Sequence, residues 1–271
     1  MGLLPERTTK PSGNIDDYTI LVYGESGVGK TTFSNGAPKP IILDFEDGTK
    51  GMEAYRVQIG SWENFKRAIT ELLNEKHDFQ TVVIDTLSNG QKMCDEYICK
   101  RERVSSVDKV GYGKGHGYVL DEIIREFNRI KPKFDMDTNE RIGGFHTLVM
   151  CHQKVKVNQP PEGEAFDELV PELVGKLYEK MPGMVDCVLH AGYAMVQKKK
   201  SRVLRVSDYL MAKTKDRSGR LPSMIRLEYA ALAKAFKEKV GITEDAPEEP
   251  KRAEDGHPEQ QELGGEPVMT A

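Results

Sequence analysis

The stretch Gly24-Glu25-Ser26-Gly27-Val28-Gly29-Lys30-Thr31 matches the phosphate-binding pattern G-x-x-x-x-G-K-[ST] at every fixed position. Glycines in this pattern let the backbone curl so that successive N–H groups point at phosphates, and the next helix adds the positive end of its dipole. The lysine reaches the β- and γ-phosphates, and the following hydroxyl ligates Mg²⁺. We therefore expect a nucleotide site made by Gly24, Glu25, Ser26, Gly27, Val28, Gly29, Lys30, Thr31 and Thr32.

The pattern has the sequence context that a phosphate loop needs. Residues 18–23 read Y-T-I-L-V-Y, a run of β-branched and aromatic side chains typical of a buried strand. Further short apolar strands are predicted at residues 41–43, 81–84, 147–151 and 187–190. Stretches with helical spacing separate them, including one that begins after Ser61, a residue suited to cap a helix. This alternation predicts an α/β fold with a mostly parallel sheet and helices on both faces.

Less regular segments are expected elsewhere. Residues 131–144 are polar and predict a loop. Two short strands, 193–196 and 203–206, flank the basic residues 197–202 and predict a hairpin with a basic tip. Residues 224–240 predict a last helix.

The length of 271 residues suits one large domain with flanking segments. We expect an N-terminal arm at residues 1–17, an ATPase core at 18–242 and a tail at 243–271. Residues 244–271 hold nine acidic and two basic side chains, so with an overall charge of −4 the tail is acidic and the body mildly basic. The tail has almost no apolar residues, which predicts disorder.

The cysteines and the hydropathy indicate a cytoplasmic protein. Cys94, Cys99, Cys151 and Cys187 form no C-x-x-C pair and no metal-ligand spacing with the histidines, so we expect reduced thiols. No apolar run approaches the roughly 18 residues that a membrane span needs.

An acidic residue ends the third predicted strand. Residues 81–86 read T-V-V-I-D-T, and an aspartate at such a strand tip can hold the Mg²⁺ shell, usually through water. Many buried strands end in aspartate merely to begin a turn. Downstream of a phosphate loop, however, the pattern favours Asp85 together with Thr31 as the metal-binding pair.

A second acidic residue follows the predicted strand at 41–43. Residues 41–46 read I-I-L-D-F-E, which places Glu46 at the carboxyl edge of the sheet, where sites in parallel sheets lie. A carboxylate there can polarise the water that attacks the γ-phosphate. Glu46 is therefore a candidate general base, and a solvated turn acid is the competing interpretation.

Several classes of phosphate-loop protein do not fit. The N-K-x-D guanine-reading motif of GTPases is absent. Residues 87–91 read L-S-N-G-Q and look like a transporter-ATPase signature, but that signature precedes the Asp-bearing strand, whereas here it follows. Residues 120–150 contain no compact arginine cluster of the kind that forms a kinase lid.

Over about residues 18–220 the order of these motifs resembles the RecA-like recombinase fold, in particular phage-encoded RecA-like ATP-binding proteins that act in single-strand annealing. The strand ending D-x-E puts Glu46 at the catalytic-base position of that family. The strand order of the class would place 147–151 between 18–23 and 81–84, with 41–43 beyond the latter.

The resemblance also implies roles for residues after the fourth strand. Cys151-His152-Gln153-Lys154 stands where the family has a polar γ-phosphate sensor, so His152 or Gln153 is expected to sense the γ-phosphate. Residues 154–171 then correspond to the second DNA-binding loop and residues 111–117 to the first. Candidate contacts to single-stranded DNA are Tyr112, Lys114, Lys154 and Lys156.

Lys213-Thr214-Lys215 resembles the K-x-K that RecA-like proteins extend to the ATP of a neighbouring subunit. The two lysines are expected to lie on one side of an extended segment. An exposed basic loop is the competing interpretation. The chain lacks an evident RecA-type polymerisation segment and C-terminal domain, which favours a ring or short filament over long helical filaments.

These inferences predict an ATPase, stimulated by DNA, with ATP and Mg²⁺ as cofactors. It would bind single-stranded DNA, assemble with itself, and promote annealing or strand exchange in phage DNA recombination. A single-strand DNA-binding protein is a further expected partner. The alternative is a P-loop ATPase that is not a recombinase, such as a helicase-loading partner or a small-molecule kinase.

Overall fold

The computed structural model describes residues 8, 10–136, 138–160, 163–207, 209 and 211–243. The predicted disordered tail lies outside the described residues except for Thr243, and so do residues 1–7 and 9 of the predicted arm. A 3-10 turn, η1 (Ile15–Asp17), precedes the first strand, and its Ile15 is buried. The packed chain therefore begins a few residues before Tyr18.

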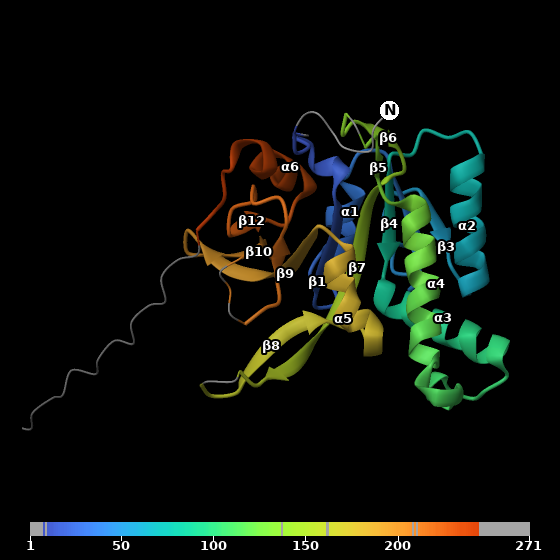
Figure 1. Ribbon diagram of the computed structural model, residues 1–271. Helices are drawn as coiled ribbons and strands as arrows, with labels where there is room; N and C mark the ends of the chain where they lie inside the picture. Colours follow the sequence, from blue (N-terminus) through green and yellow to red (C-terminus); the bar gives the residue numbers. More distant parts are fainter. Residues whose placement is uncertain are drawn as a thin grey trace, which may run out of the picture.

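A ten-stranded sheet forms the centre of the molecule (Figure 1), and its main path runs β12-β10-β9-β1-β7-β4-β2-β3. Pairing is parallel from β9 to β3, and β10 and β12 add antiparallel strands at one edge. The strands of this path are β1 (Thr19–Gly24), β2 (Pro40–Asp44), β3 (Arg56–Gln58), β4 (Thr81–Asp85), β7 (His146–Asn158), β9 (Cys187–Val196), β10 (Lys199–Arg205) and β12 (Met224–Arg226).

The predicted strand order is confirmed. β7 lies between β1 and β4, with Tyr23 opposite Cys151 and Ile84 opposite Val149, and β2 lies beyond β4. This is the order of the RecA-like P-loop class, in which a strand separates the phosphate-loop strand from the Asp-bearing strand. The side chains of β1 are buried throughout, as expected of a central parallel strand.

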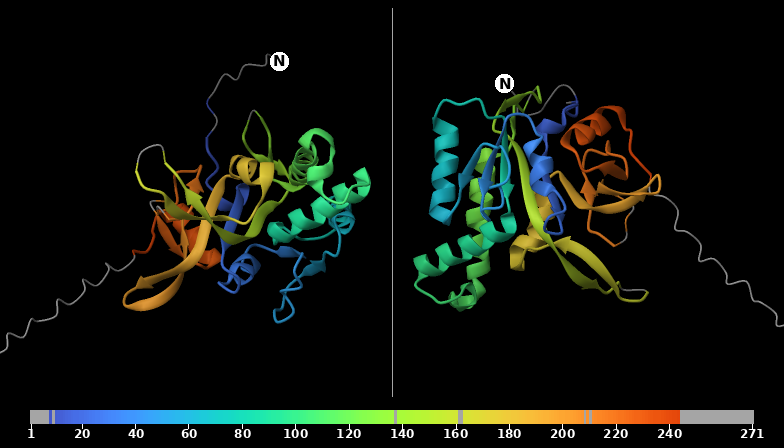
Figure 2. Two further views of the ribbon diagram at one scale, coloured as in Figure 1. Left: turned by 90° about the horizontal axis from the view of Figure 1, so that it is seen from below. Right: turned by 180° about the vertical axis from the view of Figure 1, so that it is seen from behind.

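Helices cover both faces of the sheet (Figure 2). One face packs against α2 (Trp62–Asn74), α3 (Leu87–Glu102), α4 (Gly115–Ile130) and α5 (Gly175–Met184), and the other against α1 (Lys30–Asn35) and α6 (Tyr229–Glu238). The helix α2 begins where the sequence predicts, because the Ser61 hydroxyl accepts a hydrogen bond from the Asn64 N–H at 3.2 Å.

Two segments that were predicted as loops are hairpins. Within 131–144, β5 (Lys133–Phe134) pairs with β6 (Arg141–Gly143). Within 154–171, the second half of β7 pairs with β8 (Phe166–Pro171), and this hairpin projects from the sheet (Figure 1). The sequence prediction missed these hairpins because strand pairing depends on a distant partner rather than on local pattern.

The end of the chain differs from the prediction in two further respects. β9 is continuous from residue 187 to 196, and β10 begins at Lys199, so the hairpin tip is only Gln197 and Lys198, both with positive φ. Residues 224–240 split into β12 and α6 instead of forming one helix. A two-residue strand, β11 (Lys215–Asp216), pairs with the start of β9.

Two short 3-10 turns, η2 (Val107–Lys109) and η3 (Gly111–Gly113), lead into α4. The second of them, η3, contains residues 111–113 of the predicted first DNA-binding loop, and residues 115–117 of that loop already belong to α4. Within the described ranges, no helix combines the length and the apolar character needed to cross a membrane.

Candidate nucleotide site

The phosphate loop connects β1 to α1 at the carboxyl edge of the sheet. Two of its glycines are required by geometry. Gly24 lies so close to β9 that a Cβ would come within 2.2 Å of the Ala191 carbonyl oxygen, and Gly29 has a φ of +112°. Gly24 therefore allows the close contact between β1 and β9, and Gly29 allows the left-handed backbone conformation before α1.

Lys30 lies folded over this loop. Its ammonium donates hydrogen bonds to the carbonyl oxygens of Gly24 at 3.0 Å and Glu25 at 2.9 Å. Burial lowers the pKa of Lys30, and the nearby carboxylates of Asp85 and Glu46 oppose that shift. The ammonium is held at the loop without a direct carboxylate partner among the described residues, which suits a cation that receives phosphate.

The two predicted metal ligands are in direct contact. The Thr31 hydroxyl donates to Asp85 Oδ2 at 2.6 Å, although the two residues are 54 positions apart. Burial raises the pKa of Asp85 to about 6, and the hydrogen bond from Thr31 opposes the rise. A hydroxyl and a buried carboxyl at this spacing form the oxygen donor set that Mg²⁺ prefers.

Glu46 receives three hydrogen bonds on the same oxygen. Its Oε1 accepts from the Thr86 hydroxyl, from Asn89 Nδ2 at 3.1 Å and from His152 Nε2 at 2.6 Å. Burial alone would raise the pKa of Glu46, but the bonds from His152 and Thr86 outweigh it and the pKa is lowered. In the described part of the chain Oε2 has no hydrogen-bond donor, so this oxygen remains for another partner.

Asp44 fixes the turn that carries Glu46. It is buried and accepts hydrogen bonds from the Glu46 N–H at 2.9 Å and the Thr49 hydroxyl at 2.7 Å. Burial would raise the pKa of Asp44, but these hydrogen bonds lower it. Asp44, the first acid of the D-x-E pattern, therefore stabilises the turn, whereas Glu46, the second, faces the nucleotide cavity.

His152 and Gln153 point to opposite faces of β7. His152 lines the nucleotide cavity beside Glu46. Gln153 Nε2 donates to Glu25 Oε1 at 3.4 Å, and its Oε1 accepts from His190 Nε2 at 3.0 Å. Burial lowers the pKa of His190 to about 4, so its ring is neutral at pH 7. Both sensor candidates therefore contact the site: His152 binds Glu46, and Gln153 binds Glu25 of the phosphate loop.

A cavity of about 420 Å³ joins these groups. Its lining includes the predicted Lys30, Thr31, Thr32, Glu46, Asp85 and His152. It also includes Met52 and Arg202, which the sequence analysis did not place at the nucleotide. Arg202 could not be recognised because the basic run 197–202 predicted a hairpin tip, whereas the residue lies within β10.

The L-S-N-G-Q stretch is the beginning of α3, directly after β4. Its Asn89 holds Glu46, and its Ser88 hydroxyl accepts from the His152 N–H at 3.0 Å. Gln91 exchanges hydrogen bonds with the backbone of Val174. The stretch therefore supports the site from within one chain, in agreement with the rejection of a transporter signature.

Lys213 and Lys215 both face α5 of their own chain. Lys215 Nζ donates to the carbonyl oxygens of Pro182 at 2.5 Å and Val185 at 2.9 Å, at the end of α5. Lys213 Nζ lies 5.0 Å from the centroid of the Tyr178 ring. The expectation that they share one side agrees with this geometry, and a contact to a neighbouring subunit stays a prediction.

The predicted DNA-binding residues fall into two places. Tyr112 is fully exposed in η3, and Lys114 is the residue between η3 and α4. Lys154 Nζ and Lys156 Nζ lie 5.3 Å and 4.7 Å from the Tyr178 ring centroid. With Lys213 they form a set of three ammonium groups around one tyrosine, called here the Tyr178 cluster.

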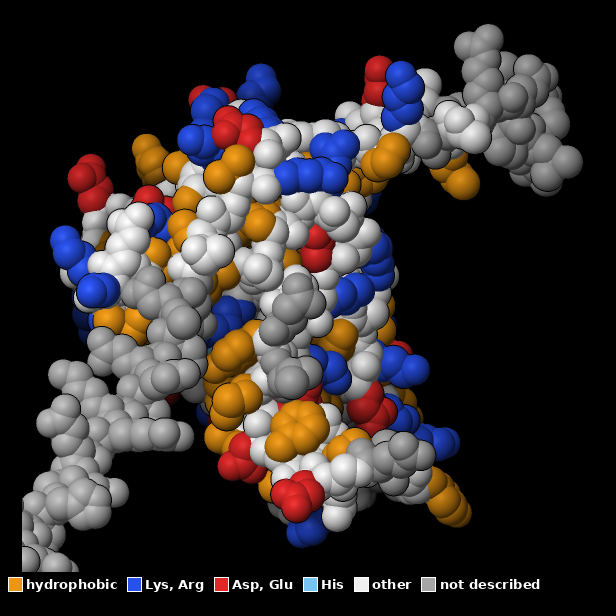
Figure 3. All heavy atoms as spheres, turned by 90° about the vertical axis from the view of Figure 1, so that its left-hand side faces the viewer, with side chains coloured by type: hydrophobic (Ala, Val, Ile, Leu, Met, Phe, Trp, Pro, Cys, Tyr) orange, Lys and Arg blue, Asp and Glu red, His pale blue; other side chains and the backbone are white. Residues whose placement is uncertain are grey.

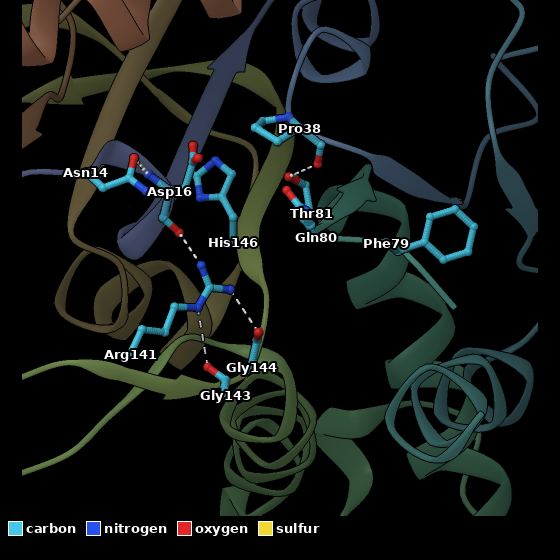
Figure 4. Close-up of a pocket in the computed structure, with 10 residues that line it drawn as sticks. All are labelled: Asn14, Asp16, Pro38, Phe79, Gln80, Thr81, Arg141, Gly143, Gly144 and His146. Carbon is cyan, nitrogen blue, oxygen red and sulfur yellow. Dashed lines mark hydrogen bonds between the residues drawn. The ribbon is translucent and has the colours of Figure 1, made fainter. Parts of the chain in front are cut away.

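A second cavity, of about 390 Å³, lies at the amino end of β4 and β7, away from the phosphate loop (Figure 4). The side chains of Arg141, Thr81 and His146 in its lining already have partners. The Arg141 guanidinium donates to the carbonyl oxygens of Asp16, Gly143 and Gly144, and the Thr81 hydroxyl donates to that of Pro38. These contacts connect the β5–β6 hairpin to η1, and we assign them a structural role.

The strand order, the phosphate loop and the Thr31–Asp85 pair define a P-loop NTPase of RecA-like architecture, a class that binds nucleotides, typically with Mg²⁺. Residues 16–218 match a family model described as an AAA domain (AAA_24). The chain belongs to this family.

The chain is similar to a curated phage-derived protein and to a solved structure. A SPbeta prophage-derived uncharacterized protein, YorG of Bacillus subtilis (strain 168), is 27% identical over 123 residues, which are 43% of this chain and 38% of that protein. The match therefore spans well under half of that relative. The KaiC-like protein PH0186 of Pyrococcus horikoshii OT3 aligns over 74% of this chain and 82% of its own, with 13% identity and a TM-score of 0.38.

Proposed function

We propose that this protein is a DNA-stimulated ATPase of recombination that binds single-stranded DNA and promotes annealing or strand exchange. The Tyr178 cluster is the observation that carries the nucleic-acid part of the proposal. Lys154 and Lys156 lie on β7, Lys213 comes from a distant segment just before β11, and the three ammonium groups converge on one ring. In the described ranges none of the three has a carboxylate within ion-pair distance. Phosphate groups would relieve their repulsion, and an aromatic ring beside them suits a single strand.

The nucleotide site supports hydrolysis of ATP. Thr31 and Asp85 would hold Mg²⁺, and Lys30 would bind the β- and γ-phosphates. When bound, Mg²⁺ supplies positive charge that stabilises the transferred phosphoryl group. Glu46 Oε2 would accept a proton from the attacking water, while the three donors on Oε1 fix the carboxylate in place.

The two parts of the proposal are physically connected. β7 begins beside the phosphate-loop strand, carries His152 and Gln153 at the site, and continues to Lys154 and Lys156 in the projecting hairpin. A nucleotide that changes the contacts of His152 or Gln153 would therefore act on the strand that carries the lysines. In this proposal the protein assembles with itself, as a ring or short filament, and a single-strand DNA-binding protein is a further partner.

ATPase rate and DNA binding test the proposal together. Purified protein should hydrolyse ATP faster with single-stranded oligonucleotide than without. Lys156→Ala should weaken oligonucleotide binding and reduce the salt slope of the binding constant by about one. The matched control is Lys237→Ala, which removes an exposed lysine of α6 on the other face of the sheet.

Turnover that needs a small-molecule acceptor and ignores DNA would instead identify a kinase. DNA-independent turnover combined with binding of a helicase would indicate a loading partner. Equal DNA affinity in Lys156→Ala, Lys237→Ala and the wild type would show that the Tyr178 cluster does not bind DNA.

A further inference from the structure

Among the described residues that line the nucleotide cavity, Arg202 alone comes from a strand beyond β9. The strand β9 continues past the sheet edge after Ala191, the residue opposite Gly24, and β10 returns alongside it with Arg202 opposite Tyr193. The hairpin of β9 and β10 therefore overhangs the phosphate loop. The Arg202 carbonyl accepts from the Leu227 N–H at 3.1 Å, which fixes the backbone in this position.

The guanidinium lies directly on the loop. Arg202 Nη1 would be 3.4 Å, and Cδ 3.7 Å, from a Cβ built on Gly29. The side chain is exposed, and in the described ranges it has neither a hydrogen-bond acceptor nor a carboxylate partner. On the face that Figure 3 shows, basic side chains are interspersed with hydrophobic and acidic ones and do not form one patch. Arg202 lines the cavity together with Gly29 and Thr32.

We propose that Arg202 binds the α-phosphate and nucleoside end of the nucleotide within its own subunit. The sheet order supplies the orientation. Asp85 and His152 reach the cavity from β4 and β7, and Glu46 from the turn after β2, all on one side of the phosphate-loop strand. Arg202 comes from β10, on the other side. The carboxylates mark the end where the phosphoryl bond breaks, so a cation on the opposite side faces the part of the nucleotide that remains.

A guanidinium group can bind both the α-phosphate and the base of the nucleoside. It donates paired hydrogen bonds to phosphate oxygens, and its flat face stacks on an aromatic ring such as a purine. Tyr193, opposite Arg202 on β9 and partly exposed, adds an aromatic surface on the same side of the hairpin. The inference rests on the proposed nucleotide binding and adds a residue outside the phosphate-loop motif.

Equilibrium binding of fluorescent ATP and ADP analogues to the full chain, without DNA, tests the assignment. Arg202→Gln should raise the Kd for ATP and for ADP about 10-fold each, because both nucleotides keep the α-phosphate and nucleoside. Arg202→Lys should lose less affinity, because it keeps the charge but not the paired geometry. The matched control is Lys199→Gln, an exposed charge loss on the same strand, with an unchanged Kd.

The outcomes separate this inference from the proposed function. Unchanged affinities in Arg202→Gln, with binding abolished in Lys30→Ala, would overturn the role of Arg202 and leave the nucleotide site intact. A loss for ATP alone would place the guanidinium at the γ-phosphate and also overturn the assignment. A wild-type protein that binds neither nucleotide would contradict the proposed function itself. Equal melting temperatures of the unliganded proteins would show that the variants are folded.

Discussion

Glu46 is the side chain proposed to activate the attacking water, and its carboxylate is held by several hydrogen bonds. Three donors from two elements, β7 and the start of α3, converge on its Oε1. They hold the carboxylate ionised and orient it, at the cost of some basicity. As a general base, the role proposed for it, Glu46 would depend on its position more than on its proton affinity.

Replacing Glu46 by Gln should separate binding from turnover. The amide keeps the size of the side chain but cannot take a proton from water, so ATP should still bind while hydrolysis slows by about 10²–10⁴-fold. Steady-state ATPase rates and nucleotide Kd values on the same preparation measure both effects. Hydrolysis at the wild-type rate would show that Glu46 is not the base.

The ionised form of Asp85 that would bind a metal ion is expected to lower the stability of the metal-free protein. Its pKa is raised by burial to about 6, so the folded protein holds this proton more tightly than the unfolded chain does. The ionised carboxylate therefore destabilises the metal-free protein above about pH 6, by roughly 3 kcal/mol, and the penalty vanishes below about pH 4. Asp85→Asn should melt at a higher temperature than the wild type at pH 8 but not at pH 4.

The same variant should lose the Mg²⁺-dependent part of nucleotide affinity, because an amide replaces the charged metal ligand. Asp121→Asn, at an exposed position of α4, provides the control for a simple change in net charge. If Asp85→Asn were less stable than wild type at pH 8, burial of the charge would not be the dominant effect.

At the scale of elements, the β7–β8 hairpin is tied to the core by Tyr23 in β1. The Tyr23 hydroxyl lies 2.9 Å from the carbonyl oxygens of both Leu169 and Lys213. One buried hydroxyl thus connects the phosphate-loop strand to β8 and to the segment that carries Lys213. Burial raises the pKa of Tyr23 far above its usual range, so the hydroxyl stays protonated and can donate.

Tyr23→Phe should loosen this connection. The loss of one buried hydrogen bond is expected to cost about 1–2 kcal/mol of unfolding free energy. Hydrogen exchange should accelerate locally at the amides of Leu169 and Lys213, with smaller changes in β4. Tyr55→Phe, at a position 70% exposed, is the matched control. Uniform acceleration over the whole sheet would mean that the hydroxyl supports the core in general and not this junction.

At the scale of the whole molecule, the resemblance predicts an active site shared between subunits through Lys213 and Lys215. The structure gives each lysine a contact within its own chain, so a role in a neighbour's site requires that Lys215 exchange its two carbonyl partners for a phosphate. A cation supplied in this way can raise the rate of phosphoryl transfer by about 10³–10⁵-fold.

Subunit mixing tests this prediction. Lys30→Ala and Lys215→Ala should each be inactive alone, and mixtures should regain part of the ATPase activity, because one partner supplies the phosphate loop and the other the lysine. Melting curves must accompany the assay, since Lys215 also binds the end of α5. If the proteins co-assemble and no mixing ratio restores activity, the lysines keep only their contacts around α5.

The sequence by itself determined the parts of this protein that depend on contiguous residues. The phosphate loop is one uninterrupted motif, Asp85 ends an apolar strand, and the alternation of strands and helices predicted the parallel sheet. The motif order, through the family resemblance, also predicted the strand order, with β7 between β1 and β4.

Only the tertiary structure decided which distant residues meet. His152 reaches Glu46 across 106 positions, Arg202 reaches Gly29, and three lysines surround Tyr178, because strand register and hairpin pairing bring these side chains together. For the same reason, the sequence did not predict the hairpin of β7 and β8 or the continuity of β9. A strand's backbone groups are satisfied by a partner elsewhere in the chain, and no local pattern specifies where that partner is.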